Sequence, residues 1–230
     1  MAEVGGTLPD TQVRAMFDRI AGVYDVMNSV MTAGMHQRWR ERAVELAKVE
    51  AGLRALDVAT GTGDLAVALA EAGAEVVGCD FSEEMLARAR RKAPSLEFEW
   101  ADALSLPYAD ESFDAATVGF GARNFSDLGR GLAEMTRVVR PGGRVVVLEI
   151  TTPQRPPLST FFSLWFDRAV PAIGRLVGDP DAYSYLPSSV KRFPDPPALA
   201  AEMAAAGLRE VRWLVTAGGI IAIHSGTVPR

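Results

Sequence analysis

Cysteine and histidine are nearly absent, with one cysteine and two histidines among 230 residues. A single thiol, Cys79, cannot form an internal disulfide bond, which favours a reducing environment and a small buried role for this side chain. His36 and His224 lie far apart in the sequence, and with one cysteine they match no metal-ligand spacing, so we expect no metal site. These scarcities exclude a fold held together by disulfides or zinc.

Long apolar runs and clusters of basic residues are also missing. No window of about 18 apolar residues could span a bilayer, and the N-terminal residues lack the basic start and apolar run of a secretory signal. A net charge of −5 without a Lys/Arg-rich block makes nucleic acid an unexpected partner. With 48% hydrophobic and 23% charged residues, we expect one domain over residues 1–230. We expect it to be cytoplasmic, with at most peripheral contact at the inner face of the membrane.

Residues 53–150 alternate between apolar runs and helical patterns. This alternation predicts an α/β fold with a mostly parallel sheet and helices on both faces. Two of the helices have start signals at Ser82 and Ser126, each followed by an acidic residue. The apolar runs predicted to be strands are LRALDVA, AEVVGCD, LEFEWAD, FDAATVGF and GRVVVLEI.

The segments on either side of this core are different. Residues 10–49 are predicted to form a helical cap before the first strand, and residues 152–194, rich in proline and aromatics, interrupt the alternation. In residues 195–230, Asp195 predicts a helix start and Gly207 its end. Two further strands around a glycine pair predict a hairpin, which should give the sheet an antiparallel last strand.

A glycine turn joins the first predicted strand to the next helix. Gly61 and Gly63 fit the G-x-G-x-x-G/A pattern of nucleotide-binding turns, in which the backbone approaches the ligand closely. Asp80 closes the second strand 17 residues after Gly63, where a carboxylate can accept both hydroxyls of a ribose. The glycines alone are a weak signal, because tight turns also need glycine for steric reasons. Asp80 at the end of the second strand makes a nucleoside site the preferred interpretation.

Further acidic residues indicate which nucleoside ligand fits. Asp57 precedes the turn and Asp64 opens the following helix, so they would repel a pyrophosphate and tolerate a ligand with ammonium and sulfonium groups. We therefore expect Asp57 at the cofactor site. Asp102 and the backbone at Ala103 follow the third strand, where they could read the amino group and a ring nitrogen of adenine. Asp64 could also be only a helix-start residue, and Asp102 only a solvated loop acid.

These motifs resemble the class I S-adenosylmethionine-dependent methyltransferases. The resemblance implies a Rossmann-like fold with a seven-stranded sheet, and S-adenosylmethionine as the cofactor. It also implies that Gly61, Thr62 and Gly63 contact the methionine part, that Asp80 binds the ribose, and that Gly119 lies near the reacting methyl group. The stretches that carry it are LDVATGTGD, CDFSEEML, ADALSLPYADESFD and RVVRPGGRVVVLEI.

Two longer stretches, YDVMNSVMTAGMHQRW (24–39) and RVVRPGGRVVVLEIT (137–151), resemble signatures of the demethylmenaquinone/ubiquinone C-methyltransferases of quinone biosynthesis. Thr32, Arg140 and Thr151 stand where that family prefers Ser, Lys and Ser. With GFGARN and GGIIAIHSG, the resemblance covers nearly the whole chain. It implies C-methylation of a prenylated quinol, by preference a menaquinone precursor. The alternatives are a ubiquinone-pathway quinol, another small-molecule methyltransferase, a nucleotide-binding oxidoreductase and a non-catalytic partner protein.

Methylation of a ring carbon requires that the neighbouring hydroxyl lose its proton. The adjacent ring hydroxyl must ionise, and a phenol has a pKa of about 10, so a nearby cation or base must assist. Arg123, in the loop after the fourth strand, could stabilise the phenolate, or it could form a surface ion pair. Tyr24, Asp25 and His36 are further candidates. His36 could shuttle a proton or cap a helix and pack against Trp39.

Residues 158–177 are densely apolar. They predict either a helix packed on the sheet or an apolar lid that takes an isoprenoid chain and approaches the bilayer surface. The sequence leaves the oligomeric state open, a homodimer included. The apolar members are Phe161, Phe162, Leu164, Trp165, Phe166, Ile173 and Leu176.

Overall fold

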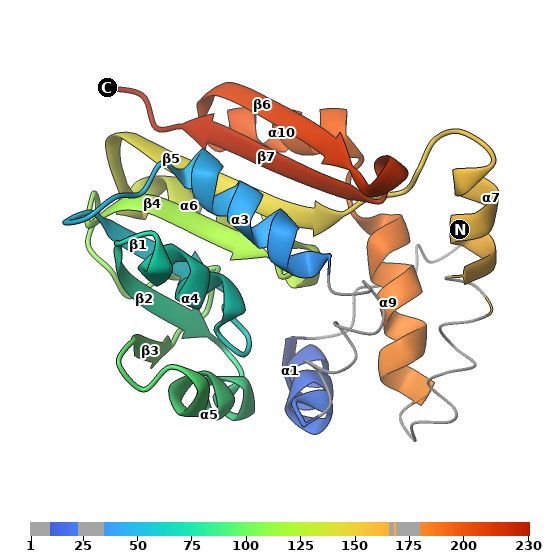
Figure 1. Cartoon of the computed structure of the whole chain (residues 1–230), viewed down its shortest axis with the longest axis horizontal. Helices are drawn as coiled ribbons and strands as arrows, with labels where there is room; N and C mark the ends of the chain where they lie inside the picture. Colours follow the sequence, from blue (N-terminus) through green and yellow to red (C-terminus); the bar gives the residue numbers. More distant parts are fainter. Residues whose placement is uncertain (1–9, 23–34, 166–167, 169–179) are drawn as a thin grey trace.

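The computed structural model describes residues 10–22, 35–165, 168 and 180–230, in which a seven-stranded sheet is flanked by helices (Figure 1). The strands lie in the order β3-β2-β1-β4-β5-β7-β6. The strands are β1 (Arg54–Val58), β2 (Glu75–Asp80), β3 (Glu97–Trp100), β4 (Phe113–Gly119), β5 (Val139–Ile150), β6 (Arg209–Thr216) and β7 (Ile221–Thr227).

The sheet confirms the predicted mostly parallel arrangement. Strands β1 to β5 pair in parallel, and β7 pairs antiparallel with both β5 and β6. The antiparallel last strand therefore lies inside the sheet, and β6 forms the edge. In this register Asp57 lies between Gly78 of β2 and Thr117 of β4. Because parallel strands end together, the carboxyl ends of β1, β2 and β4 meet at one edge of the sheet.

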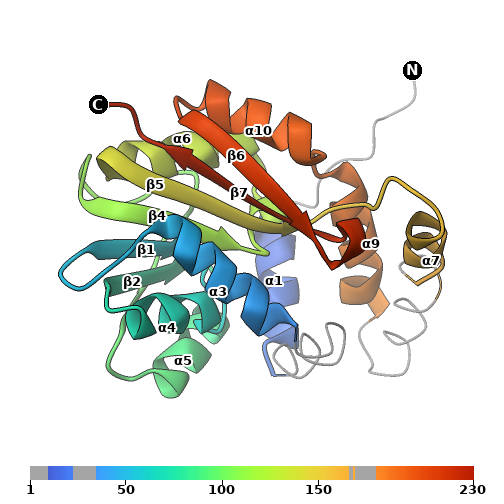
Figure 2. The same ribbon diagram turned by 45° about the horizontal axis from the view of Figure 1, so that its top comes forward.

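Helices cover both faces, as predicted (Figures 1 and 2). One apolar core lies between the sheet and α3 (His36–Ala47), α4 (Asp64–Glu71) and α5 (Glu83–Lys92). A second core lies on the opposite face, under α6 (Leu128–Val138) and α10 (Pro196–Ala205). The central strands are buried by both layers, which agrees with their nearly continuous apolar sequences.

The helix ends follow the predicted capping chemistry with one shift. The side chains of Ser82 and Asp195 each accept a backbone N–H from the first turn of α5 and α10. Helix α6 instead begins one residue later than predicted, because Asp127, and not Ser126, is the N-cap whose carboxylate accepts such a bond. Gly207 follows α10 with φ +97°, the left-handed conformation expected after a helix end.

Three helices lie beyond the carboxyl ends of the strands (Figures 1 and 2). They are α1 (Asp10–Ile20), α7 (Leu158–Leu164) and α9 (Pro180–Arg192). Helices α1 and α9 pack together through Val13, Met16 and Tyr185. None of the helices in the described ranges is both long enough and apolar enough to cross a membrane. The predicted cap and lid segments thus contribute helices on the side where the parallel strands end.

Candidate active site

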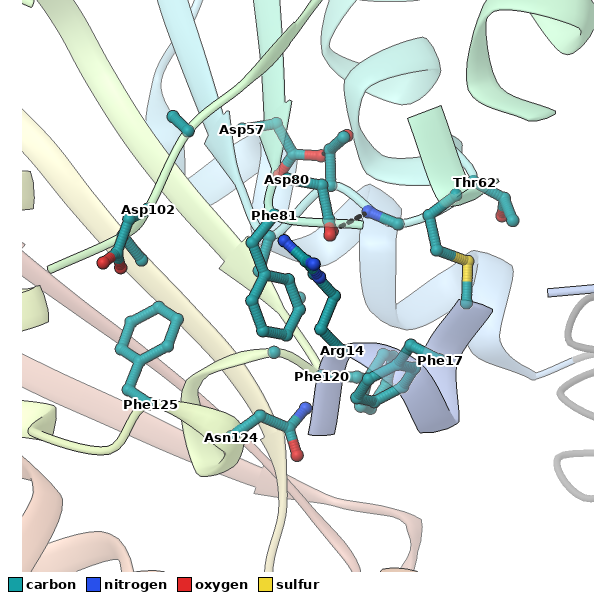
Figure 3. Close-up of a pocket in the computed structure, with 18 of the residues that line it drawn as sticks. Arg14, Phe17, Asp57, Thr62, Asp80, Phe81, Asp102, Phe120, Asn124 and Phe125 are labelled. Atoms are coloured by element: carbon teal, nitrogen blue, oxygen red, sulfur yellow. Dashed lines mark hydrogen bonds between the residues drawn. The ribbon is translucent and has the colours of Figure 1, made fainter. Parts of the chain in front are cut away.

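A cavity lies at the carboxyl ends of β1, β2 and β4, with α1 along one side (Figure 3). Of the residues predicted to bind a cofactor, all but Gly63 line it. Their contact with a cofactor stays a prediction, but the fold has brought them to one place. The lining includes Thr11, Arg14, Phe17, Arg40, Asp57, Ala59, Thr60, Gly61, Thr62, Asp64, Leu65, Asp80, Phe81, residues 100–104, Gly119, Phe120, Gly121, Asn124 and Phe125.

The glycine turn is built from left-handed backbone. Ala59, Gly61 and Gly63 have φ values of +51°, +57° and +85°. A Cβ on Gly61 would meet no atom within 4 Å, so this position faces open space in the cavity wall. A Cβ on Gly63 would lie 2.9 Å from Cζ of Phe98. Gly63 is therefore required by its conformation and by the packing of α4 against the β3 side of the sheet.

Asp57 is a buried carboxylate at the end of β1. Its two oxygens accept hydrogen bonds from the hydroxyls of Thr60 (2.6 Å) and Thr117 (2.7 Å). Burial raises its pKa from 3.8 to about 6, and the two hydroxyl bonds oppose that rise only in part. At neutral pH the carboxyl group is therefore ionised although its burial away from water makes the charged form unfavourable. A cation bound in the cavity would compensate this charge.

Asp80 supplies a second buried carboxylate, at the end of β2. One oxygen accepts the backbone N–H of Gly61 and the other that of Ser82, both at 2.9 Å. Burial raises its pKa to about 6, and the backbone N–H bonds oppose this. Each carboxylate oxygen has more than one lone pair, so Asp80 can still accept the hydroxyls of a ribose.

Asp64 does not contribute to the negative charge in the way the sequence suggested. Its carboxylate pairs with Arg40 at 2.8 Å and with Lys92 at 2.7 Å. The repulsion expected toward a pyrophosphate therefore comes from Asp57 and Asp80, and not from acids on both sides of the turn.

Arg123 lies behind the cavity wall. Its guanidinium pairs with the buried Glu149 at 2.7 Å and also donates to the carbonyl of Phe120, and it does not line the cavity. Its side chain is 7% exposed and that of Glu149 is 1% exposed, so this is a buried pair and not the surface ion pair considered above. Phe120 itself has φ +60° and lines the cavity. The observed geometry lets Arg123 hold a strained turn in place, and its role toward a phenolate stays a prediction.

His36 is the one further acid–base candidate that lies in the described residues. Tyr24 and Asp25 lie outside the described residues. His36 is buried as the first residue of α3, with Met35 at the N-cap position, so the capping interpretation is wrong. His36 does not line the cavity. Its role as a proton shuttle stays a prediction.

His224 belongs to the buried core of the sheet. It is fully buried in β7, and its Nε2 lies 2.9 Å from the carbonyl of Pro196. Burial lowers its pKa, because desolvation disfavours the charged ring. Within the described residues, no three His, Cys, Asp or Glu side chains are grouped to hold a metal ion.

Several cavity residues were missed at the level of sequence. Figure 3 shows Arg14 and Phe17 extending from α1 into the cavity, and Phe81, Phe120 and Phe125 lining it. Phe81 and Phe120 come directly after β2 and β4, so their position after a strand end was a usable signal. Together the aromatic rings give this acidic cavity an apolar wall.

Comparison with known proteins agrees with this geometry. The chain is 49% identical over 221 residues to the demethylmenaquinone methyltransferase of Thermus thermophilus, covering 93% of this chain and all of that protein. It is 48% identical to the protein of the same name from Deinococcus radiodurans, covering 86% of this chain and 85% of that one.

A solved structure shares the fold. A SAM-dependent methyltransferase from Thermotoga maritima superposes with a TM-score of 0.68 over 93% of this chain and 99% of that one, at 21% identity. The sequence model of one family extends over nearly the whole chain, at residues 6–228. The chain therefore belongs to the ubiE/COQ5 methyltransferase family.

Proposed function

We propose that this protein transfers the methyl group of S-adenosylmethionine to a ring carbon of a prenylated quinol, by preference demethylmenaquinol. The observation that carries the proposal is the meeting of two buried carboxylates, Asp57 and Asp80, with an aromatic wall in one cavity at the strand ends. The names of the relatives supply the quinol, since the Thermus thermophilus and Deinococcus radiodurans proteins are demethylmenaquinone methyltransferases.

The residues present fit S-adenosylmethionine. Asp80 is positioned to accept the ribose hydroxyls, and the loop with Asp102 and Ala103 lies on the same cavity for the adenine. Asp57 is a buried anion whose charge an ammonium or sulfonium group would compensate. When bound, the cofactor supplies an electrophilic methyl group. The protein has to position the acceptor carbon in line with it and exclude water.

The aromatic wall supports an apolar, ring-shaped acceptor. Phe17, Phe120 and Phe125 line the cavity from α1 and from the loop after β4. Asn124 adds one polar side chain there, whose Oδ1 accepts from the Tyr185 hydroxyl at 3.2 Å. A quinol ring could lie between these groups with its hydroxyl toward the polar side. We propose that Arg123, Tyr24 and His36 assist ionisation of that hydroxyl, with Arg123 acting through the turn it holds.

We further propose that α7 meets the prenyl chain or the membrane surface. Phe162 is buried against Val190 of α9, whereas Phe161 and Leu164 are 60% and 51% exposed. The helix thus packs with one face and leaves apolar side chains on the other, and the exposed Arg155 precedes it. An apolar face flanked by a basic residue suits the interface of an anionic membrane. Phe166, Ile173 and Leu176 lie outside the described residues.

The test is methyl transfer from labelled S-adenosylmethionine to demethylmenaquinol kept reduced. The oxidised quinone and a demethoxyubiquinol analogue serve as the competing acceptors. Label in the naphthoquinol alone is the expected result. The oxidised quinone should take no label because its ring is too electron-poor to attack, and the ubiquinol analogue should take none because the proposed acceptor is the menaquinone precursor. Label in the ubiquinol analogue would move the protein to the ubiquinone pathway. Cofactor binding without label in any quinol would overturn the acceptor and leave the methyltransferase fold intact.

A further inference from the structure

The connection between β3 and β4, residues 101–112, has no helix or strand of its own, yet it forms part of the cavity wall. Residues 101–104 line the cavity, and Asp102 accepts the backbone N–H of Leu104 through its side chain at 2.8 Å. Without a helix or a sheet ladder, the remaining polar groups of this backbone need other partners. What holds residues 104–110 therefore also fixes where Asp102 and Ala103 stand.

One face of α6 provides those partners. Arg130, Glu134 and Arg137 are four and three residues apart, so they project from the same side of the helix. Arg130 Nε donates to the carbonyl of Leu104 at 2.7 Å. A Glu134 carboxylate oxygen accepts the backbone N–H of Leu106 at 2.8 Å. The two ends of one short stretch of loop are thus tied to the same helix.

Arg137 makes the largest number of these contacts. It donates to the carbonyls of Leu106 (3.0 Å) and Tyr108 (2.8 Å) and pairs with Asp110 at 2.7 Å. It also makes two hydrogen bonds with Glu134, at 2.8 and 2.7 Å, and these bonds hold the pKa of Glu134 below its ordinary value. A planar guanidinium can satisfy such a set of acceptors at once, which a lysine cannot.

We propose that Arg137, with Glu134, is a positioning residue that sets the recognition of the adenine base by the 101–104 loop. The inference rests on the proposed cofactor. Arg137 does not line the cavity, so it acts through the backbone of residues 104–110. If that backbone relaxes, the Asp102 carboxylate no longer stands at a fixed distance from the adenine amino group. The protein then loses its selectivity for the adenine amino group, while the ribose and methionine parts of the ligand still bind.

The experiment measures binding by calorimetry, without a quinol. It compares S-adenosylhomocysteine with S-inosylhomocysteine, in which an oxygen replaces the adenine amino group. The variants are Arg137→Gln and, as a conservative one, Arg137→Lys. Arg140→Gln is the matched control. It removes the same charge at a position three residues after Arg137, and the partner of Arg140 is Asp114 and not a residue of the 101–104 loop. Thermal unfolding of each variant reports whether it folds.

We expect the wild type and the Arg140→Gln control to prefer the adenosyl ligand by the same factor. Arg137→Gln should reduce this preference about tenfold, the size of one hydrogen bond to a charged group, with Arg137→Lys in between. An unchanged ratio overturns the proposal, and so does an equal loss of affinity for both ligands. If Arg137→Gln does not fold, the same two affinities are measured for Glu134→Gln, which keeps the side-chain shape. The same loss of preference for the adenosyl ligand is then expected. A wild type that binds neither ligand would instead overturn the proposed function.

Discussion

Replacement of Asp57 by asparagine is expected to stabilise the ligand-free protein at pH 8 while weakening its hold on the cofactor. The carboxylate is 1% exposed and interacts with two threonine hydroxyls. A hydroxyl can donate or accept, so an asparagine can accept from one of these groups and donate to the other. The substitution therefore removes a buried charge with little change in hydrogen bonding or shape.

The magnitude follows from the pKa of Asp57. A carboxyl whose pKa is raised from 3.8 to about 6 on folding makes its ionised form about 3 kcal/mol less favourable in the folded chain than in the unfolded one. Because the folded pKa is the higher one, the stabilising effect of the bound proton is present below about pH 4 and lost as the pH rises to about 6. Asparagine has no such loss. Between about pH 4 and pH 6, the free energy of unfolding of the variant should therefore rise relative to that of the wild type. Above about pH 6 the variant should be more stable by about 3 kcal/mol.

Urea unfolding at pH 5, 6, 7 and 8 measures the difference in free energy of unfolding between wild type and Asp57→Asn. Glu71→Gln, which removes an exposed charge from α4, is the control and should change little. Calorimetry with S-adenosylmethionine should show weaker binding to Asp57→Asn at pH 8, because the compensating anion is gone. A variant less stable than the wild type at pH 8, with a parallel pH profile, would refute the reasoning.

Three further substitutions have distinct expected outcomes. Gly63→Ala should lower the free energy of unfolding by about 1–3 kcal/mol in urea titrations, since its Cβ would lie 2.9 Å from Phe98 and its φ is +85°. Glu149→Gln should cost about 3–5 kcal/mol by the same measurement, because it leaves the buried positive charge of Arg123 without a counter-charge. Adding Arg123→Met should recover most of that loss. Phe161→Ser should change stability by less than about 0.5 kcal/mol but reduce sedimentation with anionic vesicles, and equal sedimentation would count against the membrane contact of α7.

The strands could be predicted because each signal is local. Each strand of the parallel part is rich in apolar residues, and the turn after β1 needs left-handed backbone that glycine supplies. The side chains at the strand ends, such as Asp57 and Asp80, then meet by topology alone, since parallel strands end at one edge. For the same reason Asp102, after β3, was predictable as a cavity residue.

What could not be predicted depends on partners far away in the sequence. Arg123 was placed at the correct edge of the sheet, but its guanidinium is drawn to Glu149, which another strand brings beside it. Helix α1 was expected, but not the face that it turns to the cavity. That face is fixed by Val13 and Met16 packing on Tyr185 of α9. Direction of a side chain is set by packing, which local patterns do not encode.

The place of β7 inside the sheet has a consequence for how the chain can be made. Strand β5, with the buried Val145, Val146 and Val147, needs β7 as its neighbour, yet β7 is synthesised only after α7, α9 and α10. Until then one side of β5 is an open edge of apolar sequence, which is the kind of strand that pairs with other chains. A ribosome-bound or truncated chain without the hairpin would therefore be prone to aggregate, even with its whole cofactor cavity already translated.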